Sequence, residues 1–377
     1  MRNLFFYGSL RHLPLLEIVL GRDASTIETQ SLALNDHVVS AVAEGPFPMI
    51  EAQSGAQAAG LLVQGLSAQD IDRLDFYEGS FAYDLLAVKL ADGQGAEVYF
   101  PQAGLWTPRG PWSLGEWQHK WAELSCIAAR EVMSYYGRKP REDVAQMFPM
   151  IRSRAQARIN AVTTRHGSGT FQGKVEIVER TRTYAEFFAL DDIYLRHQQF
   201  DGTMTETLDR AVFIATDAAL VLPYDPVRDR VLLVEQMRMG PLARGDRTLW
   251  QLEPIAGRID AGESPEACAR REAREEAGLT LGALEPVAEV YASPGTSTEF
   301  YYIYVGIADL PDTVTGTGGL DAEHEDIRSH LLSFDALMDL VDTLSAANAP
   351  LVLAAFWLAR HRDRLRSLRG GAKPEVN

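Results

Sequence analysis

Cysteine is scarce in this chain of 377 residues, which has only Cys126 and Cys268 and no CxxC pair. Their separation argues against a disulfide framework and a zinc knuckle, so both thiols are expected to be packed in the interior. Long apolar runs are also missing, because the longest, 349–359, is too short to cross a bilayer. The first eight residues lack the apolar core of a secretion signal. We therefore expect a cytoplasmic protein without a membrane partner.

Basic residues are outnumbered, with 36 Lys and Arg against 52 Asp and Glu, and the resulting net charge of −16 disfavours a nucleic-acid partner. A ligand that carries phosphate would need a local cation. The composition is otherwise globular, with 46% hydrophobic residues, 30 Gly and 18 Pro. It excludes a disordered, collagen-like or repeat protein, and the length allows two or three domains.

Apolar periodicity divides the chain into three parts. Residues 1–112 combine short apolar strands with one helical segment, which predicts a small α+β domain. A capping box at Ser113 begins a long amphipathic helix, and a second helical stretch leads to a glycine-rich linker, so 113–170 is predicted to be a helical connector. Residues 171–370 show β patterns followed by two helices, which predicts a sheet between helices.

One helix has both of its ends specified by the sequence. Ser264 can cap it, Pro265 suits its first position, and Gly278 can end it in a left-handed conformation. Three carboxylates fall on one face of this helix at positions i, i+3 and i+4, namely Glu272, Glu275 and Glu276.

Carboxylates at this spacing repel each other and raise one another's pKa, so a divalent cation is a natural counter-charge. Oxygen ligands without His or Cys favour Mg²⁺, or Mn²⁺ in its place. The alternative is a solvated acidic face that neighbouring arginines neutralise: Arg270, Arg271 and Arg274.

The line from 257 to 279, GRIDAGESPEACARREAREEAGL, follows the pattern G-x5-E-x7-R-E-U-x-E-E-x-G-U, with Ala273 as a soft match. The sequence thus resembles the Nudix hydrolases, which hold divalent metals on this loop–helix–loop and cleave a diphosphate linked to another group. The resemblance implies that the metal ligands are the Ala256 carbonyl, Glu272 and Glu276, with Glu275 beside them as a catalytic residue. It implies structural roles for the remaining motif positions, Gly257, Glu263, Arg271 and Gly278.

Segments outside this motif resemble the ADP-ribose pyrophosphatase subgroup. Residues 200–206 look like its FDG-type turn, 234–238 like its EQ-x-R strand end, and a proline follows the motif by fifteen positions. The resemblance implies substrate contacts from Arg238, Gln251, Glu253 and Pro294. An arginine there would supply the local cation that an acidic protein needs for an anionic substrate. The subgroup also implies a homodimer in which strands from 173 to 202 exchange between subunits.

A glycine run followed by acidic residues, 316–326, is similar to a loop that closes over the metals in these enzymes. The resemblance implies that Glu323 is the catalytic base and that Glu325 is a further metal ligand. The alternative is a solvent-exposed acidic loop without a catalytic role.

Near the N-terminus a short strand ends in a turn formed by Tyr7, Gly8, Ser9 and Leu10. Together with 74–79 and Tyr83, this turn resembles the γ-glutamylcyclotransferase-like family over roughly 1–110. In that family the turn amides cradle a γ-glutamyl carboxylate. The resemblance makes Glu78 the acid and base while the substrate's amine attacks its own side-chain carbonyl to give 5-oxoproline. The alternative is that Tyr7 is a core aromatic and Glu78 a surface acid. Nothing in the sequence identifies the amine half of such a substrate.

Joined in one chain, the two families resemble bacterial tellurite-resistance-type proteins. The sequence therefore predicts an α+β protein with an N-terminal γ-glutamylcyclotransferase-like small barrel or sheet, a helical connector and a C-terminal Nudix α/β/α sandwich. The implied activity is Mg²⁺-dependent hydrolysis of ADP-ribose to AMP and ribose 5-phosphate. The alternatives are hydrolysis of another nucleoside diphosphate sugar or dinucleotide, a γ-glutamylcyclotransferase with an auxiliary Nudix domain, and a non-catalytic ADP-ribose sensor.

Overall fold

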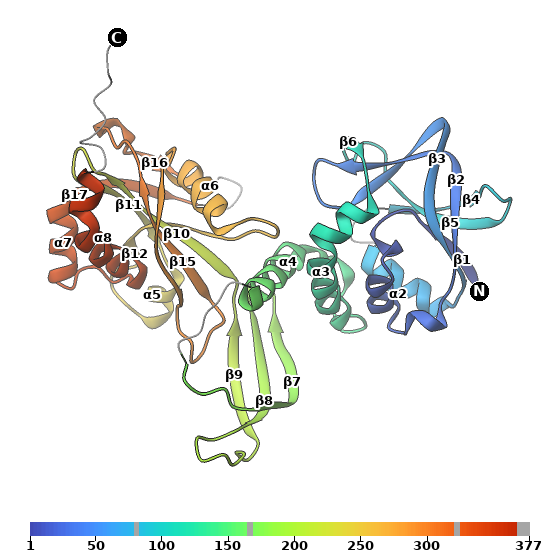
Figure 1. The fold of residues 1–377 in the computed structure, drawn as a ribbon, viewed down its shortest axis with the longest axis horizontal. Coiled ribbons are helices and arrows are strands. Elements are labelled where there is room, and N and C mark those ends of the chain that lie inside the picture. The colour runs from blue at the N-terminus through green and yellow to red at the C-terminus, as the bar shows by residue number, and fades with distance from the viewer. Residues whose placement is uncertain (79–82, 164–168, 320–324, 368–377) are drawn as a thin grey trace, which may run out of the picture. The chain divides into compact units, whose positions relative to one another are not determined.

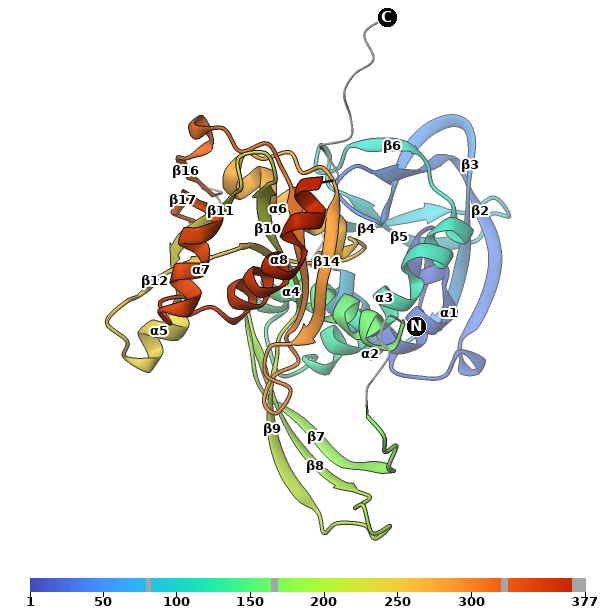
Figure 2. The same ribbon diagram turned by 60° about the vertical axis from the view of Figure 1, so that its left-hand side comes forward.

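The chain divides into two units, Met1–His166 and Gly167–Asn377. A computed structural model describes residues 1–78, 83–163, 169–319 and 325–367 (Figure 1, Figure 2). None of the helices in these ranges combines the length and the apolar character that crossing a bilayer requires.

Within 1–78 and 83–163, the first unit is built on a sheet with the strand order β4-β5-β1-β3-β2-β6. The strands are β1 (Arg2–Phe6), β2 (Glu28–Val42), β3 (Pro48–Leu66), β4 (Tyr83–Lys89), β5 (Gly95–Pro101) and β6 (Pro108–Pro111). β1 pairs with β5 in parallel, whereas the other neighbours are antiparallel. β2 and β3 form one long hairpin rather than short separate strands, because the apolar runs mark only the buried parts of each strand.

Helices pack against this sheet and complete the core of the first unit. They are α1 (Leu13–Leu20), α2 (Ala68–Glu78), α3 (Leu114–Ser134) and α4 (Arg141–Thr163), with 3₁₀ turns at Ser9–Arg11 and Ala24–Thr26. Ser113 caps α3 by accepting a hydrogen bond from the Glu116 N–H at 3.4 Å. Trp117 and Cys126 of α3 lie in the same apolar core as Leu4 of β1. The predicted connector helix therefore packs into the first unit, and the domain limits 1–112, 113–170 and 171–370 stay predictions.

The strands of the second unit form two sheets. In the smaller, β8 (Ala189–His197) pairs antiparallel with β7 (Val175–Ala185) and β9 (Leu208–Ile214). The larger has the order β14-β15-β10-β11-β17-β16, with β12 paired to β11 and β13 paired to β10. Its strands are β10 (Asp217–Asp225), β11 (Arg230–Met237), β12 (Trp250–Glu253), β13 (Ile255–Arg258), β14 (Leu284–Tyr291), β15 (Phe300–Ile307), β16 (Thr317–Gly318) and β17 (Ile327–Ser333).

Helices cover both faces of the larger sheet (Figure 1). α6 (Pro265–Ala277) lies on one face, and α7 (Phe334–Asp342) and α8 (Ala349–Ser367) lie on the other. Val221 of β10 packs in the α6 core, whereas the next residue, Leu222, packs in the α8 core. A strand buried on both faces reads as a continuous apolar run. The predicted sandwich is confirmed. Two short helices, α5 (Met239–Arg244) and a 3₁₀ turn at Asp312–Val314, lie between strands.

Candidate active sites

Helix α6 is held at both ends as the sequence predicts. The Ser264 hydroxyl accepts a hydrogen bond from the Ala267 N–H at 3.2 Å. At the other end Gly278 adopts φ 62°, and its N–H bonds to the carbonyls of Ala273 and Arg274. Because these caps keep the helix regular, the glutamates project from it at fixed spacing.

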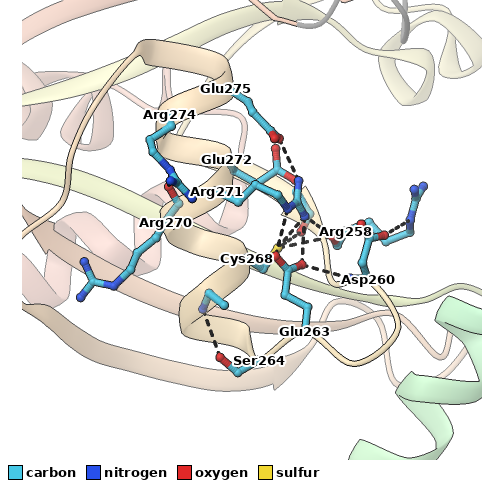
Figure 3. Close-up of polar contacts among 12 residues, drawn as sticks. Arg258, Asp260, Glu263, Ser264, Cys268, Arg270, Arg271, Glu272, Arg274 and Glu275 are labelled. Carbon is cyan, nitrogen blue, oxygen red and sulfur yellow. Dashed lines mark hydrogen bonds and ion pairs between the residues drawn. The ribbon is translucent and has the colours of Figure 1, made fainter. Parts of the chain in front are cut away.

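Arg271 connects the carboxylates of the loop and the helix (Figure 3). Its guanidinium donates to both oxygens of Glu263, with Nε–Oε1 at 2.9 Å and Nη2–Oε2 at 3.0 Å. Its Nη1 donates to Glu272 Oε1 at 2.6 Å and to Glu275 Oε2 at 2.9 Å. Its Nη2 also reaches the Arg258 carbonyl at 3.1 Å. A bidentate arginine with these partners joins the loop firmly to the helix.

Glu276 is buried among other acids. Its side chain is only 2% exposed, and within the described residues its Oε2 has no hydrogen-bond partner. Burial, with the nearby charges of Glu272 and Glu325, raises the pKa of Glu276 to about 9. Burial likewise raises the pKa of Glu272 to about 7, although Arg271 opposes the shift. These shifts describe closely spaced acids whose negative charge is only partly offset by the nearby Arg271 and Arg238.

Glycines let two backbone segments approach these acids. A Cβ atom on Gly257 of β13 would overlap the carboxylate of Glu272, and one on Gly318 of β16 would overlap the carbonyl of Glu276. A Cβ on Gly319, which has φ 101°, would lie 2.8 Å from the Cβ of Glu325. The glycine run therefore packs directly on α6 and carries Glu325 to it. The resemblance implies a loop that closes over the metals at this helix, but the sequence does not show which glycines contact the helix.

The described residues present no group of three or more His, Cys, Asp or Glu side chains already arranged around one metal position. Glu272 instead pairs with Arg271, and the predicted base Glu323 lies outside the described residues. The chemistry nevertheless fits a hard divalent cation, because Glu276 Oε2 is buried without a partner and the donors are oxygens. Ala256 lies beside this oxygen-rich group, since its backbone hydrogen-bonds to Glu276.

Of the predicted substrate contacts, Arg238 lies near this group. Arg238 donates from Nε to Glu253 Oε2 at 2.8 Å, and its charge lowers the pKa of Glu276, which places the guanidinium near the acids. Glu253 is 6% exposed, and its Oε1 accepts from Asn348 Nδ2 at 3.1 Å. Gln251 donates from Nε2 to the Thr248 carbonyl at 3.0 Å. Asn348 was not predicted, because no local pattern links it to a residue so distant in sequence.

Pro294 is exposed on the loop between β14 and β15. This loop is hydrogen-bonded to the end of β9, where the Phe213 N–H donates to the Thr296 carbonyl at 2.8 Å. The structure therefore places Pro294 near the smaller sheet of the second unit.

A second site lies in the first unit, where a cavity of about 90 Å³ opens. The predicted residues all line it: Tyr7, Gly8, Ser9, Leu10 and Glu78. Tyr83 and Pro48 line it too. A Cβ atom on Gly8 would lie 2.8 Å from Pro48 Cγ, so a glycine suits this position in the wall. Two segments far apart in sequence are thus brought to one cavity.

The cavity contains a carboxyl suited to proton transfer. Burial raises the pKa of Glu78 to about 7, so this acid can exchange a proton near neutral pH. Burial also raises the pKa of Tyr7, whose hydroxyl interacts with Tyr83. The cavity is further lined by Phe148 and Arg152 of α4, which sequence reasoning missed because the helical pattern does not reveal what the helix faces.

Family models match parts of both units. Residues 215–354 match the NUDIX domain, and residues 4–119 match the model described as gamma-glutamyl cyclotransferase, AIG2-like.

Relatives align with the second half of the chain. The ADP-ribose pyrophosphatase of Escherichia coli (strain K12) is 42% identical over 193 residues, which cover 51% of this chain and 91% of the relative. That of Haemophilus influenzae is 34% identical over 197 residues, covering 52% and 90%. The GDP-mannose pyrophosphatase of Escherichia coli O1:K1 / APEC is 30% identical over 172 residues, covering 46% and 88%. With a complete motif on α6 and relatives matched over nearly their whole length, the chain belongs to the Nudix hydrolases.

Proposed function

We propose that the second unit hydrolyses the diphosphate of ADP-ribose to AMP and ribose 5-phosphate, with Mg²⁺ as the cofactor and Mn²⁺ able to replace it. The observation that supports this most directly is the buried Oε2 of Glu276, which lacks a partner among the described residues and lies beside other acids. The likeness to ADP-ribose pyrophosphatases at 42% identity supports the choice of substrate.

The proposed metal ligands are the Ala256 carbonyl, Glu272, Glu276 and Glu325. When bound, the cation neutralises diphosphate oxygens and lowers the pKa of a coordinated water. Glu272 would then share its carboxylate between the cation and Arg271, whose Nη1 lies 2.6 Å from Glu272 Oε1 and which also bonds to Glu263 and Glu275.

Other side chains would orient the substrate and move the proton. Arg238 would donate to the diphosphate, and Glu253 holds its guanidinium at 2.7 Å. Gln251 and Pro294 would contact the rest of the substrate. We propose Glu323 as the base that accepts the proton of the attacking water, with Glu275 beside the reacting group.

The test is AMP release by the purified protein from ADP-ribose and Mg²⁺. Glu272→Gln and Glu276→Gln are expected to lose at least about 100-fold in kcat, because metal ligands act as a unit. Glu266→Gln is the matched control, since Glu266 is exposed on the same helix. An inert wild type, or a Glu276→Gln variant as active as the control, contradicts the proposal.

A panel of substrates separates the alternatives. GDP-mannose or a dinucleotide hydrolysed faster than ADP-ribose would assign a different diphosphate, as the likeness to a GDP-mannose pyrophosphatase allows. Tight binding of ADP-ribose without hydrolysis would assign a sensor.

A homodimer through the smaller sheet is also proposed. Its strands and turns expose large apolar side chains, namely Val175, Ile177, Val178, Tyr184, Phe187, Phe188 and Tyr194. Apolar surface of this extent marks an interaction site. Sedimentation is expected to give a dimer mass for the wild type and a monomer mass for Ile177→Asp. Leu353→Asp, on exposed α8 surface, is the control. A cytoplasmic location and a link to tellurite resistance stay predictions of the sequence.

A second candidate function is γ-glutamylcyclotransferase activity in the first unit. It is favoured by the presence of Glu78, with a pKa of about 7, in the same cavity as the turn 7–10. Release of 5-oxoproline from a γ-glutamyl amide that is abolished by Glu78→Gln, but not by Glu123→Gln on exposed α3 surface, would establish it. Absence of 5-oxoproline with every γ-glutamyl amide tried would reject it.

A further inference from the structure

Arg258 of β13 carries a guanidinium to which the described residues offer no hydrogen bond. Its Nε is buried without a partner in this part of the chain, although the side chain as a whole is 31% exposed. Nε forms an ion pair with Asp260 Oδ1 at 3.8 Å, which is too long for a hydrogen bond. The Asp260 side chain is itself 58% exposed, so this ion pair contributes little.

Other arginines of the second unit are bonded to acids. Arg271 and Arg362 each donate to carboxylates. Arg230 also has a buried Nε without a partner among the described residues, but its Nη1 donates to Asp312 at 2.5 Å. A guanidinium has five N–H donors, and burying part of it without hydrogen bonds costs free energy. The Arg258 guanidinium therefore suits an anionic ligand.

The side chain of Arg258 lies on the opposite side of β13 from the acids of α6. Gly257, the residue before it, faces Glu272, and successive side chains of a strand point to opposite faces. Figure 3 shows the Arg258 guanidinium directed away from α6. Its Cζ lies 5.8 Å from the ring centroid of Phe187, in the turn between β7 and β8. An anion at Arg258 is therefore separate from phosphates that a cation on Glu272 would neutralise.

A row of paired residues leads from Arg258 toward Arg238. Arg258 pairs with Ala218 of β10, and Ala218 pairs with Tyr301 of β15. Neighbouring strands lie about 5 Å apart, so the backbones of Arg258 and Tyr301 are about 10 Å apart. Burial raises the pKa of Tyr301, and the charge of Arg238 acts against this shift, which places Arg238 near that end of the row. One elongated ligand can contact both arginines.

We propose that Arg258 binds a phosphate monoester that the substrate carries in addition to its diphosphate, so that the preferred substrates are ADP-riboses phosphorylated on one ribose. This inference rests on the proposed hydrolysis of ADP-ribose. Arg238 is assigned to the diphosphate, which leaves Arg258 for a second anionic group. A phosphate monoester is the anion that ADP-ribose can carry through its hydroxyl groups, and a guanidinium binds it with two parallel N–H donors.

The bond that breaks is the same as in ADP-ribose. Water attacks one phosphorus of the diphosphate, the P–O–P bridge breaks, and the water's proton passes to the base, while the phosphate monoester stays on its ribose. A 2′-phosphate on the adenosine gives 2′-phospho-AMP and ribose 5-phosphate. A 1″-phosphate on the other ribose gives AMP and ribose 1,5-bisphosphate.

The test compares ADP-ribose with its 2′-phosphate and its 1″-phosphate, on the full-length protein with Mg²⁺. We expect wild-type kcat/KM to favour one phosphorylated compound over ADP-ribose by at least about 10-fold, because charge-assisted hydrogen bonds contribute that much. Which compound is favoured tells which ribose carries the phosphate. Arg258→Gln is expected to remove the preference, mainly through KM, and Arg258→Lys to keep part of it. Arg360→Gln, on exposed α8 surface, is the control.

Equal kcat/KM for all three compounds in the wild type overturns the proposal. An Arg258→Gln variant that loses the same factor with every compound also overturns it, since that result assigns Arg258 a structural role. A change from dimer to monomer mass in Arg258→Gln would assign the guanidinium to a subunit interface instead.

If the wild type hydrolyses none of the three compounds, the hydrolase function fails, and titration calorimetry without Mg²⁺ decides on the phosphate site. Tighter binding of a phosphorylated compound that Arg258→Gln abolishes would keep the site. Equal or absent binding would reject it.

Discussion

Gly257 of β13 lies so close to Glu272 of α6 that a Cβ atom on the glycine would overlap the glutamate's carboxylate. The backbone of β13 is therefore in direct contact with the Glu272 side chain of α6. The carboxylate's position depends on both, because it has the glycine on one side and Arg271 on another, with Nη1–Oε1 at 2.6 Å. A change at either neighbour should move the acid.

Gly257→Ala is expected to lower kcat for ADP-ribose by about 10-fold or more. The reason is that a shift of about 1 Å in the position of a catalytic group has an effect of at least that size. The fold should survive, because the overlapping atoms belong to a flexible side chain. Steady-state kinetics and a melting curve measure both effects. Gly240→Ala is the control, since its Cβ would meet open space. Unchanged kcat in Gly257→Ala would show that Glu272 has no part in turnover.

Mg²⁺ is expected to raise the melting temperature of the wild type, because a ligand that binds only the folded state stabilises it. A rise of about 3 °C or more is expected at saturating Mg²⁺. Glu276→Gln should lose this rise while Glu266→Gln retains it. The measurement is differential scanning fluorimetry with and without Mg²⁺. An equal rise in all three proteins would place the cation elsewhere.

Glu78→Gln is expected to change how stability depends on pH. The folded-state pKa of Glu78 is about 7, above that of an unfolded glutamate, so its contribution to stability is present below about pH 4.5 and is lost as pH rises through 7. Relative to Glu78→Gln, the wild type should lose about 2 kcal/mol between pH 4 and pH 8, since the side chain is half-buried. Urea unfolding across this range tests it, and parallel stability curves would contradict it.

Asp229 should contribute stability with the opposite pH dependence. Burial opposes its ionisation, but hydrogen bonds from Arg362, Tyr224 and Arg366 lower its pKa to about 2. The contribution is therefore present above about pH 4 and is lost as pH falls toward 2.

Asp229→Asn is expected to lower the free energy of unfolding by about 2 kcal/mol at pH 7 and by much less near pH 2. Asparagine tolerates the φ of 56° at this turn, so the backbone should be kept. Asp363→Asn, exposed on α8, is the control. If the wild type and Asp229→Asn have the same urea midpoint at pH 7, the link between α8 and the β10–β11 turn contributes nothing to stability.

Much of the site on α6 could be predicted because its determinants are local. Ser264 and Gly278 set the helix ends, and helical spacing puts Glu272, Glu275 and Glu276 on one side. Their different environments could not be predicted. The backbones of β13 and β16 cover only part of the helix face that carries the three glutamates. Glu276 is therefore buried, whereas Glu275 pairs with Arg271.

The sequence by itself determined three features. These are helix α6 with its caps, the motif that assigns the family, and the two chain segments that carry the N-terminal turn and Glu78. These depend on neighbours a few residues away. The tertiary structure decided that Arg152 reaches the cavity, that Asn348 holds Glu253, and which carboxylate oxygen is left without a hydrogen-bond partner among the described residues. Burial and charge at those positions depend on backbone segments distant in the chain, and no local pattern encodes how closely such segments approach.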